Sequence, residues 1–232
     1  MRLTVVDFET TGTPTETDPH AVVEIGWCCV EIMGGGEVAV HDPASLLVNP
    51  KRAIDVEAKA VHHITEAMLE AAPPPEIGFR RLVDTAPDVW VAHHADFEQS
   101  FFGGGDRPWL CTYKASCRIF PDAPSHSNQV LRYWLDLHLE WELAATAHRA
   151  GPDAYVTAHL LAELIRSGTP IEEMVRWSKG AALLPRMNFG KYRGQRWEEA
   201  PTDYLRWIVE KSEMDRDVKA NARHHLKLRG AR

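Results

Sequence analysis

Apolar positions group along the chain into segments of two kinds, and strand-like segments dominate the first third. Residues 3–8 carry apolar side chains on both faces of a strand, which is typical of a central strand in a sheet. Residues 21–32 are rich in Val, Ile, Trp and Cys and predict a second strand. After the turn at Gly34-Gly35-Gly36 we expect a third strand near residues 37–40 or 45–48, and a short buried strand at 89–92.

Segments of helical composition lie between and after these strands. The last of them places four apolar side chains on one side, as an amphipathic helix requires. Strands first, then helices alternating with a buried strand, predict an α/β fold with a mixed sheet flanked by helices. The expected helices are residues 53–72, 77–84, 96–102, 128–138 and 155–166.

The chain divides into a large and a small part. Its 232 residues fit one domain with a small appendage, and we place the boundary after a stop signal at 167–170, giving domains 1–178 and 179–232. Residues 185–232 carry 12 Lys and Arg against 7 Asp and Glu, a net charge of +5, whereas the rest carries 14 against 26, a net charge of −12. A small, mostly helical, basic C-terminal module that contacts a polyanion is therefore expected.

The composition excludes several classes of protein. With 44% hydrophobic and 25% charged residues the chain is typical of a globular protein, and no apolar run approaches the ~20 residues of a membrane-spanning helix. A carboxylate already at Asp7 argues against a signal peptide, so we expect a cytoplasmic protein without membrane contact. The four cysteines form no Cys-x-x-Cys pair and are expected to be reduced and mostly buried.

Asp7 and Glu9 are the first candidate functional residues. They lie two apart at the end of a buried strand, so their side chains share one face and the carboxylates converge. Two like charges this close repel each other unless a cation lies between them, and oxygen ligands favour Mg²⁺ or Mn²⁺. The pair therefore predicts a metal site.

Two further acidic positions stand at predicted helix starts. Asp96 and Glu98 follow His93-His94-Ala95, and because residues i and i+2 of a helix do not share a face, only one of them joins a cluster with Asp7. Asp153 follows Pro152 at another helix start, five residues after His148. Each acidic residue, taken alone, is also explained by helix capping or the helix dipole.

Taken in order, these segments resemble the three motifs of the DEDDh 3′→5′ exonucleases, proofreading-type nucleases with a ribonuclease H-like fold. Asp7-x-Glu9-Thr10, the helix start after His93-His94-Ala95, and His148 with Asp153 span residues 7–153 in the family's order. Residues 61–65 (Val-His-His-Ile-Thr) are similar to the family's Val-His-x-Ile-Thr loop. One departure is that Glu98 stands where the family has Asp, and His94 where it has Asn, so we favour Glu98 as the metal ligand, with Asp96 as the second choice.

The chain further resembles the exonuclease X branch, which degrades DNA. This resemblance covers nearly the whole chain and rests on Cys111-Thr112, Lys114-Ala115, Ser127-Asn128, residues 189–194 (Phe-Gly-Lys-Tyr-Arg-Gly) and residues 204–207 (Tyr-Leu-Arg-Trp). The tail also interleaves aromatic residues with cations, as single-strand binding surfaces do. Lys219, Arg223 and Lys227 are spaced by four and predict a basic stripe on a helix.

The resemblance implies two-metal hydrolysis of phosphodiesters, with Mg²⁺ or Mn²⁺ as the two divalent cations. It implies Asp7, Glu9, Glu98 and Asp153 as metal ligands and His148 as the general base, the latter because imidazole titrates near neutrality. The residues expected to bind substrate are Thr10, Thr11, His62, His94, Phe97, Lys191 and Arg193. The product would be a nucleoside 5′-monophosphate.

DNA, either single-stranded or at the 3′ ends of a duplex, is the expected substrate. The catalytic motifs do not distinguish the two sugars, so an exoribonuclease of the ribonuclease T or oligoribonuclease type stays open. Two more functions are compatible with the same motifs: a nucleic-acid-binding protein whose metal site is inactive, and a phosphodiesterase that acts on small molecules.

Overall fold

The protein is described by a computed structural model that covers residues 1–15 and 17–230. Its centre is a six-stranded mixed sheet with the order β3-β2-β1-β5-β6, in which β4 also pairs with β2. β1 is antiparallel to β2 and parallel to β5, and β5 is parallel to β6. The strands are β1 (Arg2–Thr10), β2 (Val22–Ile32), β3 (Val38–Val40), β4 (Ala44–Leu47), β5 (Val89–Ala92) and β6 (Trp109–Cys111).

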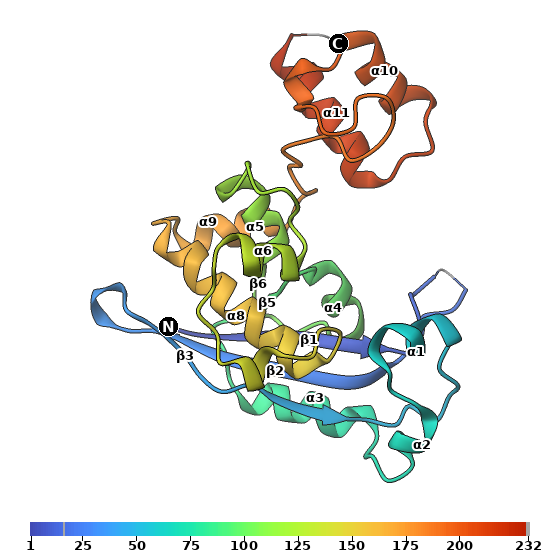
Figure 1. The fold of residues 1–232 in the computed structure, drawn as a ribbon, viewed down its shortest axis with the longest axis vertical. Helices are drawn as coiled ribbons and strands as arrows, with labels where there is room; N and C mark the ends of the chain where they lie inside the picture. Colours follow the sequence, from blue (N-terminus) through green and yellow to red (C-terminus); the bar gives the residue numbers. More distant parts are fainter. Residues whose placement is uncertain (16, 231–232) are drawn as a thin grey trace.

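Helices cover both faces of this sheet (Figure 1). In chain order they are η1 (Gly34–Gly36), α1 (Val56–His62), α2 (Glu66–Leu69), α3 (Pro75–Asp84), α4 (Ala95–Phe102), α5 (Thr112–Ile119), α6 (Asn128–Trp134), α7 (Trp141–Ala144), α8 (Ala150–Arg166), α9 (Ile171–Ser178), η2 (Trp197–Glu199), α10 (Thr202–Lys211) and α11 (Arg216–Leu228). Within residues 1–15 and 17–230, no helix is both long enough and apolar enough to span a membrane.

The alternation of side chains along β1 builds two hydrophobic cores. Leu3 and Val5 pack in a cluster with the apolar side of α8, whereas Val6 and Phe8 pack in a second cluster with Leu82 of α3. Asp7 and Glu9 continue the series of Leu3 and Val5, because successive side chains of a strand point to opposite faces. Both carboxylates therefore lie on the face that α8 covers.

The sequence predicted the central strands well and the helices less completely. The two positions considered for the third strand are both occupied, since β3 and β4 each pair with β2 at different residues. The single helix expected over 53–72 is wrong, because His63 adopts a left-handed backbone conformation (φ 61°) and separates α1 from α2. The helix expected over 155–166 begins earlier, at Ala150. Strand β6 and helices α5 and α9 were not predicted.

Residues 179–230, here called the C-terminal lobe, pack around a cluster of their own beyond α5 (Figure 1). Trp197 and Leu205 are fully buried in this cluster, together with the inner side of α11. Tyr113 and Cys117 of α5 also belong to it, so the lobe and the sheet domain share apolar contacts. All four cysteines are free, and three of them are buried, as expected.

Gly26 of β2 allows α8 to approach the sheet closely. It pairs with Asp7 across β1 and β2, and a Cβ atom built on it would lie 2.1 Å from the backbone carbonyl carbon and oxygen of Ala150. The first turn of α8 therefore reaches the sheet beside Asp7 only because this position carries no side chain.

We expect Gly26→Ala to lower the free energy of unfolding by about 1–3 kcal/mol, because the overpacked methyl group must displace the start of α8. Gly34→Ala is the matched control: a Cβ there has no atom within 4 Å, so its effect should stay within about 0.5 kcal/mol. Urea unfolding of both variants measures the difference. Equal stabilities would contradict the close approach.

Candidate active site

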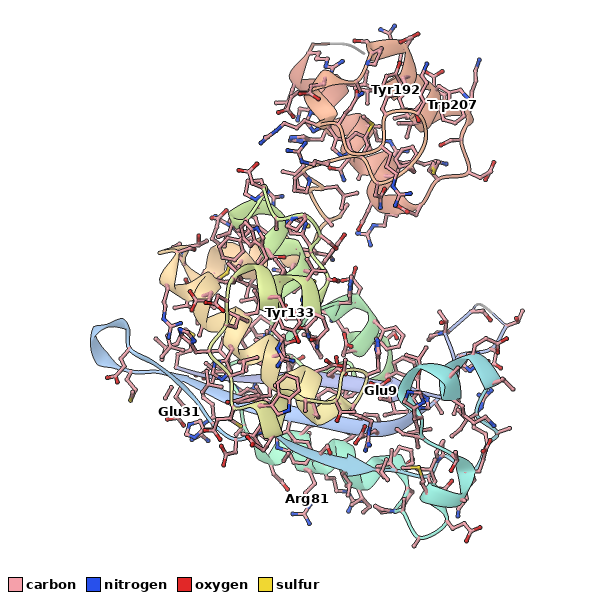
Figure 2. All side chains as sticks on the ribbon, viewed as in Figure 1. Glu9, Glu31, Arg81, Tyr133, Tyr192 and Trp207 are labelled. Atoms are coloured by element: carbon pink, nitrogen blue, oxygen red, sulfur yellow. The ribbon has the colours of Figure 1, made fainter. Side chains whose placement is uncertain are left out.

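Three carboxylates converge where the end of β1 meets the first turn of α8. One side-chain oxygen from each of Asp7, Glu9 and Asp153 lies within 4.8 Å of the others. The alternation of β1 places the first two side chains, and the close approach of α8 at Gly26 brings the third. The three predicted ligands, far apart in the sequence, thus lie together (Glu9 is labelled in Figure 2).

Asp153 is held by two donors, one on each carboxylate oxygen. The backbone N–H of His148 donates to Oδ2 at 2.7 Å, and Nε2 of Gln129 donates to Oδ1 at 3.0 Å. His148 adopts a left-handed backbone conformation (φ 59°), its side chain is exposed, and it lines the same cavity as the carboxylates. The predicted pair of His148 and Asp153 is therefore joined by a direct hydrogen bond.

Glu98 and Asp96, both in the first turn of α4, have different surroundings. The Glu98 side chain is buried, and its Oε2 atom has no hydrogen-bond partner among the described residues. Asp96 is exposed and accepts two hydrogen bonds of 2.9 Å from Nζ of the buried Lys114. Both residues line the cavity, but only Glu98 is left with an unpaired buried oxygen.

The electrostatics of the cluster reflect buried like charges. Burial, reinforced by the charge of Asp153, raises the pKa of Glu9 to about 8. Burial also raises the pKa of Glu98 to about 8 and that of Asp7 well above its usual range, with Asp153 as the next largest influence on Asp7. The pKa of Asp153 is raised by burial, although its hydrogen bond from His148 opposes the shift. Carboxylates that repel one another in this way favour a bound cation.

An ion pair between the buried Glu24 and the half-buried Arg149 lies next to the cluster and was not predicted from the sequence. Glu24 stands directly opposite Glu9 in the register of β1 and β2 and is 1% exposed. Arg149 donates to both of its carboxylate oxygens, at 2.7 and 2.8 Å, and Ala150 N–H donates at 3.1 Å. This pair fixes the chain at the position between His148 and α8. The signal for it was the carboxylate of Glu24 in the middle of the apolar run 22–30.

Three of the expected substrate-binding side chains are buried, and none of them is among the described residues that line the cavity. Thr10 donates to the carbonyl of Gly12 at 2.9 Å, and Thr11 is hydrogen-bonded to Nδ1 of His20 at 3.1 Å. Nδ1 of His62 accepts from the N–H of Ile64, so Nε2 carries the proton and donates to the carbonyl of Thr10 at 3.1 Å. All three are buried and brace the end of β1.

The remaining four expected substrate-binding residues are divided between two places. His94 and Phe97 line the cavity of the carboxylates, which measures about 580 Å³. Lys191 and Arg193 lie in the C-terminal lobe; the Lys191 ammonium is 4.8 Å from the Tyr192 ring centroid, and Arg193 lines a neighbouring cleft. Gln129 and Lys114 were not expected to contact site carboxylates, and no periodic pattern in the sequence marks them.

Comparison with known proteins assigns the class. A family model described as an exonuclease of the RNase T type matches residues 4–161. The chain therefore belongs to this exonuclease family, whose enzymes use divalent metal ions, and the expectation of a 3′→5′ exonuclease is confirmed. The acidic cluster of β1 and α8 lies within the matched segment.

Particular relatives refine the likeness. The chain is 31% identical over 234 residues to exodeoxyribonuclease 10 of Escherichia coli strain K12, an alignment that covers 97% of this chain and 98% of that protein. It is also 34% identical over 177 residues to a DNA polymerase III subunit epsilon-like protein of Rhodobacter capsulatus, covering 71% of this chain and 24% of the relative.

Solved structures confirm the ribonuclease H-like fold. The structure of exonuclease X in complex with 5′ overhanging duplex DNA superposes with a TM-score of 0.62 and 30% identity, covering 76% of this chain and 99% of the other. The nuclease domain of 3′hExo, a DEDDh family member bound to rAMP, gives a TM-score of 0.55 at 13% identity, covering 72% and 92%, and supports the fold alone.

The raised carboxylate pKa values make stability depend on pH in the absence of metal. Glu9 and Glu98 bind more protons when folded than when unfolded, so this contribution is present below pH 4.5 and is lost as pH rises through about 8. Between pH 6.5 and 8.5 we expect the free energy of unfolding to fall by about 2–4 kcal/mol. Thermal unfolding in chelator measures this loss.

Mg²⁺ or Mn²⁺ should offset the loss, because a cation replaces the protons. The gain in Tm on adding either cation should be larger at pH 8.5 than at pH 6.5. Asp7→Asn removes one buried charge, so it should raise Tm in chelator at pH 8.5 and abolish most of the cation gain. A metal-induced gain that is the same at both pH values would contradict the assignment.

Proposed function

We propose that this protein is a metal-dependent 3′→5′ exodeoxyribonuclease that releases nucleoside 5′-monophosphates from DNA. The observation that carries the proposal is the convergence of Asp7, Glu9 and Asp153 within 4.8 Å, beside His148. The similarity to exodeoxyribonuclease 10 over 97% of the chain favours DNA as the substrate.

The metal ligands follow from the chemistry of the donors. Asp7, Glu9 and Asp153 would hold one cation, and Asp7 with Glu98 a second, because the buried Oε2 of Glu98 lacks a partner and its charge acts on Asp7. Asp96 is already neutralised by Lys114. An all-oxygen donor set favours Mg²⁺ or Mn²⁺ over softer metals. When bound, such cations activate water and stabilise the charge that develops on the reacting phosphate.

His148 is the proposed general base. It stands exposed at the cavity, next to Asp153, where its imidazole takes a proton from the attacking water. The water oxygen forms a bond to phosphorus, and the bond from phosphorus to the 3′ oxygen of the preceding nucleotide breaks. The 3′ oxygen takes a proton from solvent water as it leaves, and the imidazolium of His148 returns its proton to solvent. The terminal nucleotide departs with its phosphate on the 5′ oxygen.

The residues around the carboxylates are proposed to have two different roles. His94 and Phe97 contact the terminal nucleotide, because both line the cavity. Thr10, Thr11 and His62 support the end of β1 from behind, through their internal hydrogen bonds. This division departs from the expectation that all five side chains line the nucleotide.

The C-terminal lobe is proposed as a nucleic-acid-binding module that starts after Ser178. Val218, Ala222 and Leu226 of α11 are buried, whereas Arg223 and Lys227 are exposed, so one side of the helix is left basic. Next to it, the Tyr204 and Trp207 rings are stacked at 5.6 Å, and Trp207 is 42% exposed. Exposed aromatic rings beside cations are typical of surfaces that bind single strands.

The first test is digestion of 5′-labelled DNA and RNA oligonucleotides with Mg²⁺, Mn²⁺ or chelator. We expect a 3′-to-5′ ladder on DNA that chelator abolishes. Asp7→Asn, Asp153→Asn and Glu98→Gln should each reduce activity by more than about 10³-fold, whereas the matched control Asp96→Asn should stay within about threefold. His148→Ala should cost about 10²–10⁴-fold, which is the usual contribution of a general base.

Different results have definite meanings. A ladder on RNA alone would assign an exoribonuclease, and tight binding without cleavage would assign an inactive binding protein. Full activity of Glu98→Gln with loss in Asp96→Asn would reverse the assignment of the fourth carboxylate.

A second test addresses the lobe. Reversing the charges of Lys219, Arg223 and Lys227 to Glu should weaken DNA binding and lower the slope of log Kd against log salt by about 2, since each lost phosphate contact with a single strand contributes roughly 0.7. Fluorescence anisotropy in the inactive Asp153→Asn background measures both. Arg81→Glu, on α3 at the opposite side of the sheet (Figure 2), is the control. An unchanged salt slope in the triple variant would refute the role of the stripe.

A further inference from the structure

A second cleft of about 500 Å³ adjoins the carboxylate cavity, and we call it the basic cleft. Its walls come from both parts of the molecule: His94, Tyr113 and His126 from the sheet domain, and Arg186, Asn188 and Arg193 from the C-terminal lobe. Its volume lies within the roughly 300–1,000 Å³ typical of ligand sites. None of its described lining residues is a carboxylate.

The sign of the charge changes between the two cavities. The active-site cavity is lined by six carboxylates (Asp7, Glu9, Asp96, Glu98, Asp153 and Asp217) with one lysine, whereas the basic cleft carries two arginines. Nucleic acid places a negative charge at every phosphate, so a phosphate away from the metals is repelled by the first cavity and attracted by the second. The chain therefore offers an incoming strand a favourable position directly beside the metal site.

His94 and Tyr113 form the wall that both cavities share. Their ring centroids are 4.5 Å apart with an interplanar angle of 31°. Aromatic faces of this kind stack with unpaired bases of any sequence, because every base has a π face. A base that has just passed from the basic cleft toward the carboxylates would meet this wall.

Arg193 lies in a hydrogen-bonded loop, and Arg186 lies directly before it. Met187 N–H donates to the carbonyl of Gln195 at 3.0 Å, and Gly194 N–H donates to the carbonyl of Met187 at 2.8 Å, which closes residues 187–195 into a loop. Nη1 of Arg186 donates to the Gly194 carbonyl at 3.0 Å. The other guanidinium nitrogens of Arg186 have no hydrogen-bond partner among the described residues and are available to bind a ligand. For Arg193 the only hydrogen bond among the described residues is that of its backbone N–H to the carbonyl of Gly190, so its guanidinium is unpaired there.

The loop is also fastened to the sheet domain. Nη2 of Arg196 donates to Oδ1 of Asp122 at 2.8 Å, and Asp122 lies in the segment that forms the opposite wall of the cleft. Leu184, which lines the cleft as well, is held within the lobe, because its backbone N–H donates to Oδ1 of the buried Asn221 at 2.9 Å. The first contact joins the two walls of the cleft, and the second fixes Leu184 within the C-terminal lobe.

We propose that the basic cleft binds the nucleotides directly 5′ of the terminal one, as an unpaired strand. Arg186 and Arg193 contact their phosphates, and the penultimate base stacks on the wall of His94 and Tyr113. This assignment rests on the proposed exonuclease function and adds a path for the substrate that the carboxylate cavity alone does not define.

The kinetic test varies the length of the substrate. Steady-state constants are measured for unmodified DNA of two, four and twelve nucleotides with Arg186→Glu, Arg193→Glu and the double variant. Each reversal should raise KM for the four- and twelve-nucleotide substrates by roughly tenfold, as expected for a lost charge-assisted contact, and should raise KM for the dinucleotide much less. Arg81→Glu should match the wild type at every length.

A spectroscopic test reports the stacked base without catalysis. DNA with 2-aminopurine as the penultimate base is added to the Asp153→Asn protein, and we expect its fluorescence to be quenched on binding. Tyr113→Leu should remove at least half of the quenching, whereas Tyr133→Leu, an exposed tyrosine on α6, should not. Thermal unfolding checks that the variants remain folded.

The outcomes separate the two proposals. If the wild type degrades DNA but charge reversal raises KM equally at all three lengths or not at all, the basic cleft does not guide the strand. If the wild type degrades no DNA, the proposed function fails, and the loss or persistence of quenching in Tyr113→Leu still decides whether the cleft binds the strand.

Discussion

Mutual repulsion among buried carboxylates is the constraint on which the rest of this structure depends. Asp7, Glu9 and Asp153 are brought within 4.8 Å, and burial raises the pKa of each. Such an arrangement is unfavourable by itself, so the surrounding fold must hold it in place. A central strand supplies two of the groups and the start of a long helix supplies the third, and both elements are anchored by the largest hydrophobic cluster of the described residues.

The ion pair of Glu24 and Arg149 reduces the repulsion within the cluster. Glu24 is the cross-strand neighbour of Glu9 on β2. Without Arg149, the carboxylate of Glu24 would add a further negative charge to the cluster. The guanidinium neutralises it and lowers the pKa of Glu9, in opposition to burial. Removing the half-buried arginine would leave Glu24 as an uncompensated buried charge, which is strongly destabilising. The same contact fixes the chain between His148 and α8, so electrostatics and geometry are set together.

The sequence was informative where a local period decides the structure. Strand alternation was sufficient to place Asp7 and Glu9 on one face. The order of strands and helices was sufficient for the α/β class, and the resemblance carried by the acidic motifs for the ribonuclease H-like fold. The sequence favoured Glu98 over Asp96 through the resemblance alone, because the partner of Asp96 is Lys114, which belongs to another helix and has no local signature. The contact of Thr10 and His62 with a nucleotide stays a prediction; the structure adds a hydrogen bond from Nε2 of His62 to the backbone carbonyl of Thr10, which no local pattern marks. Contacts such as Glu24 with Arg149, 125 residues apart, have no local signature.

The cluster that Tyr113 and Cys117 share with the C-terminal lobe has a consequence for how the molecule comes apart. Cys117 is 3% exposed, and separating the lobe from α5 would uncover its sulfur along with the apolar side chains around it. Exposing that surface to water is unfavourable, so the two parts resist independent melting despite their different charges. The rate at which an alkylating reagent modifies the Cys117 thiol therefore reports how often the C-terminal lobe separates from α5.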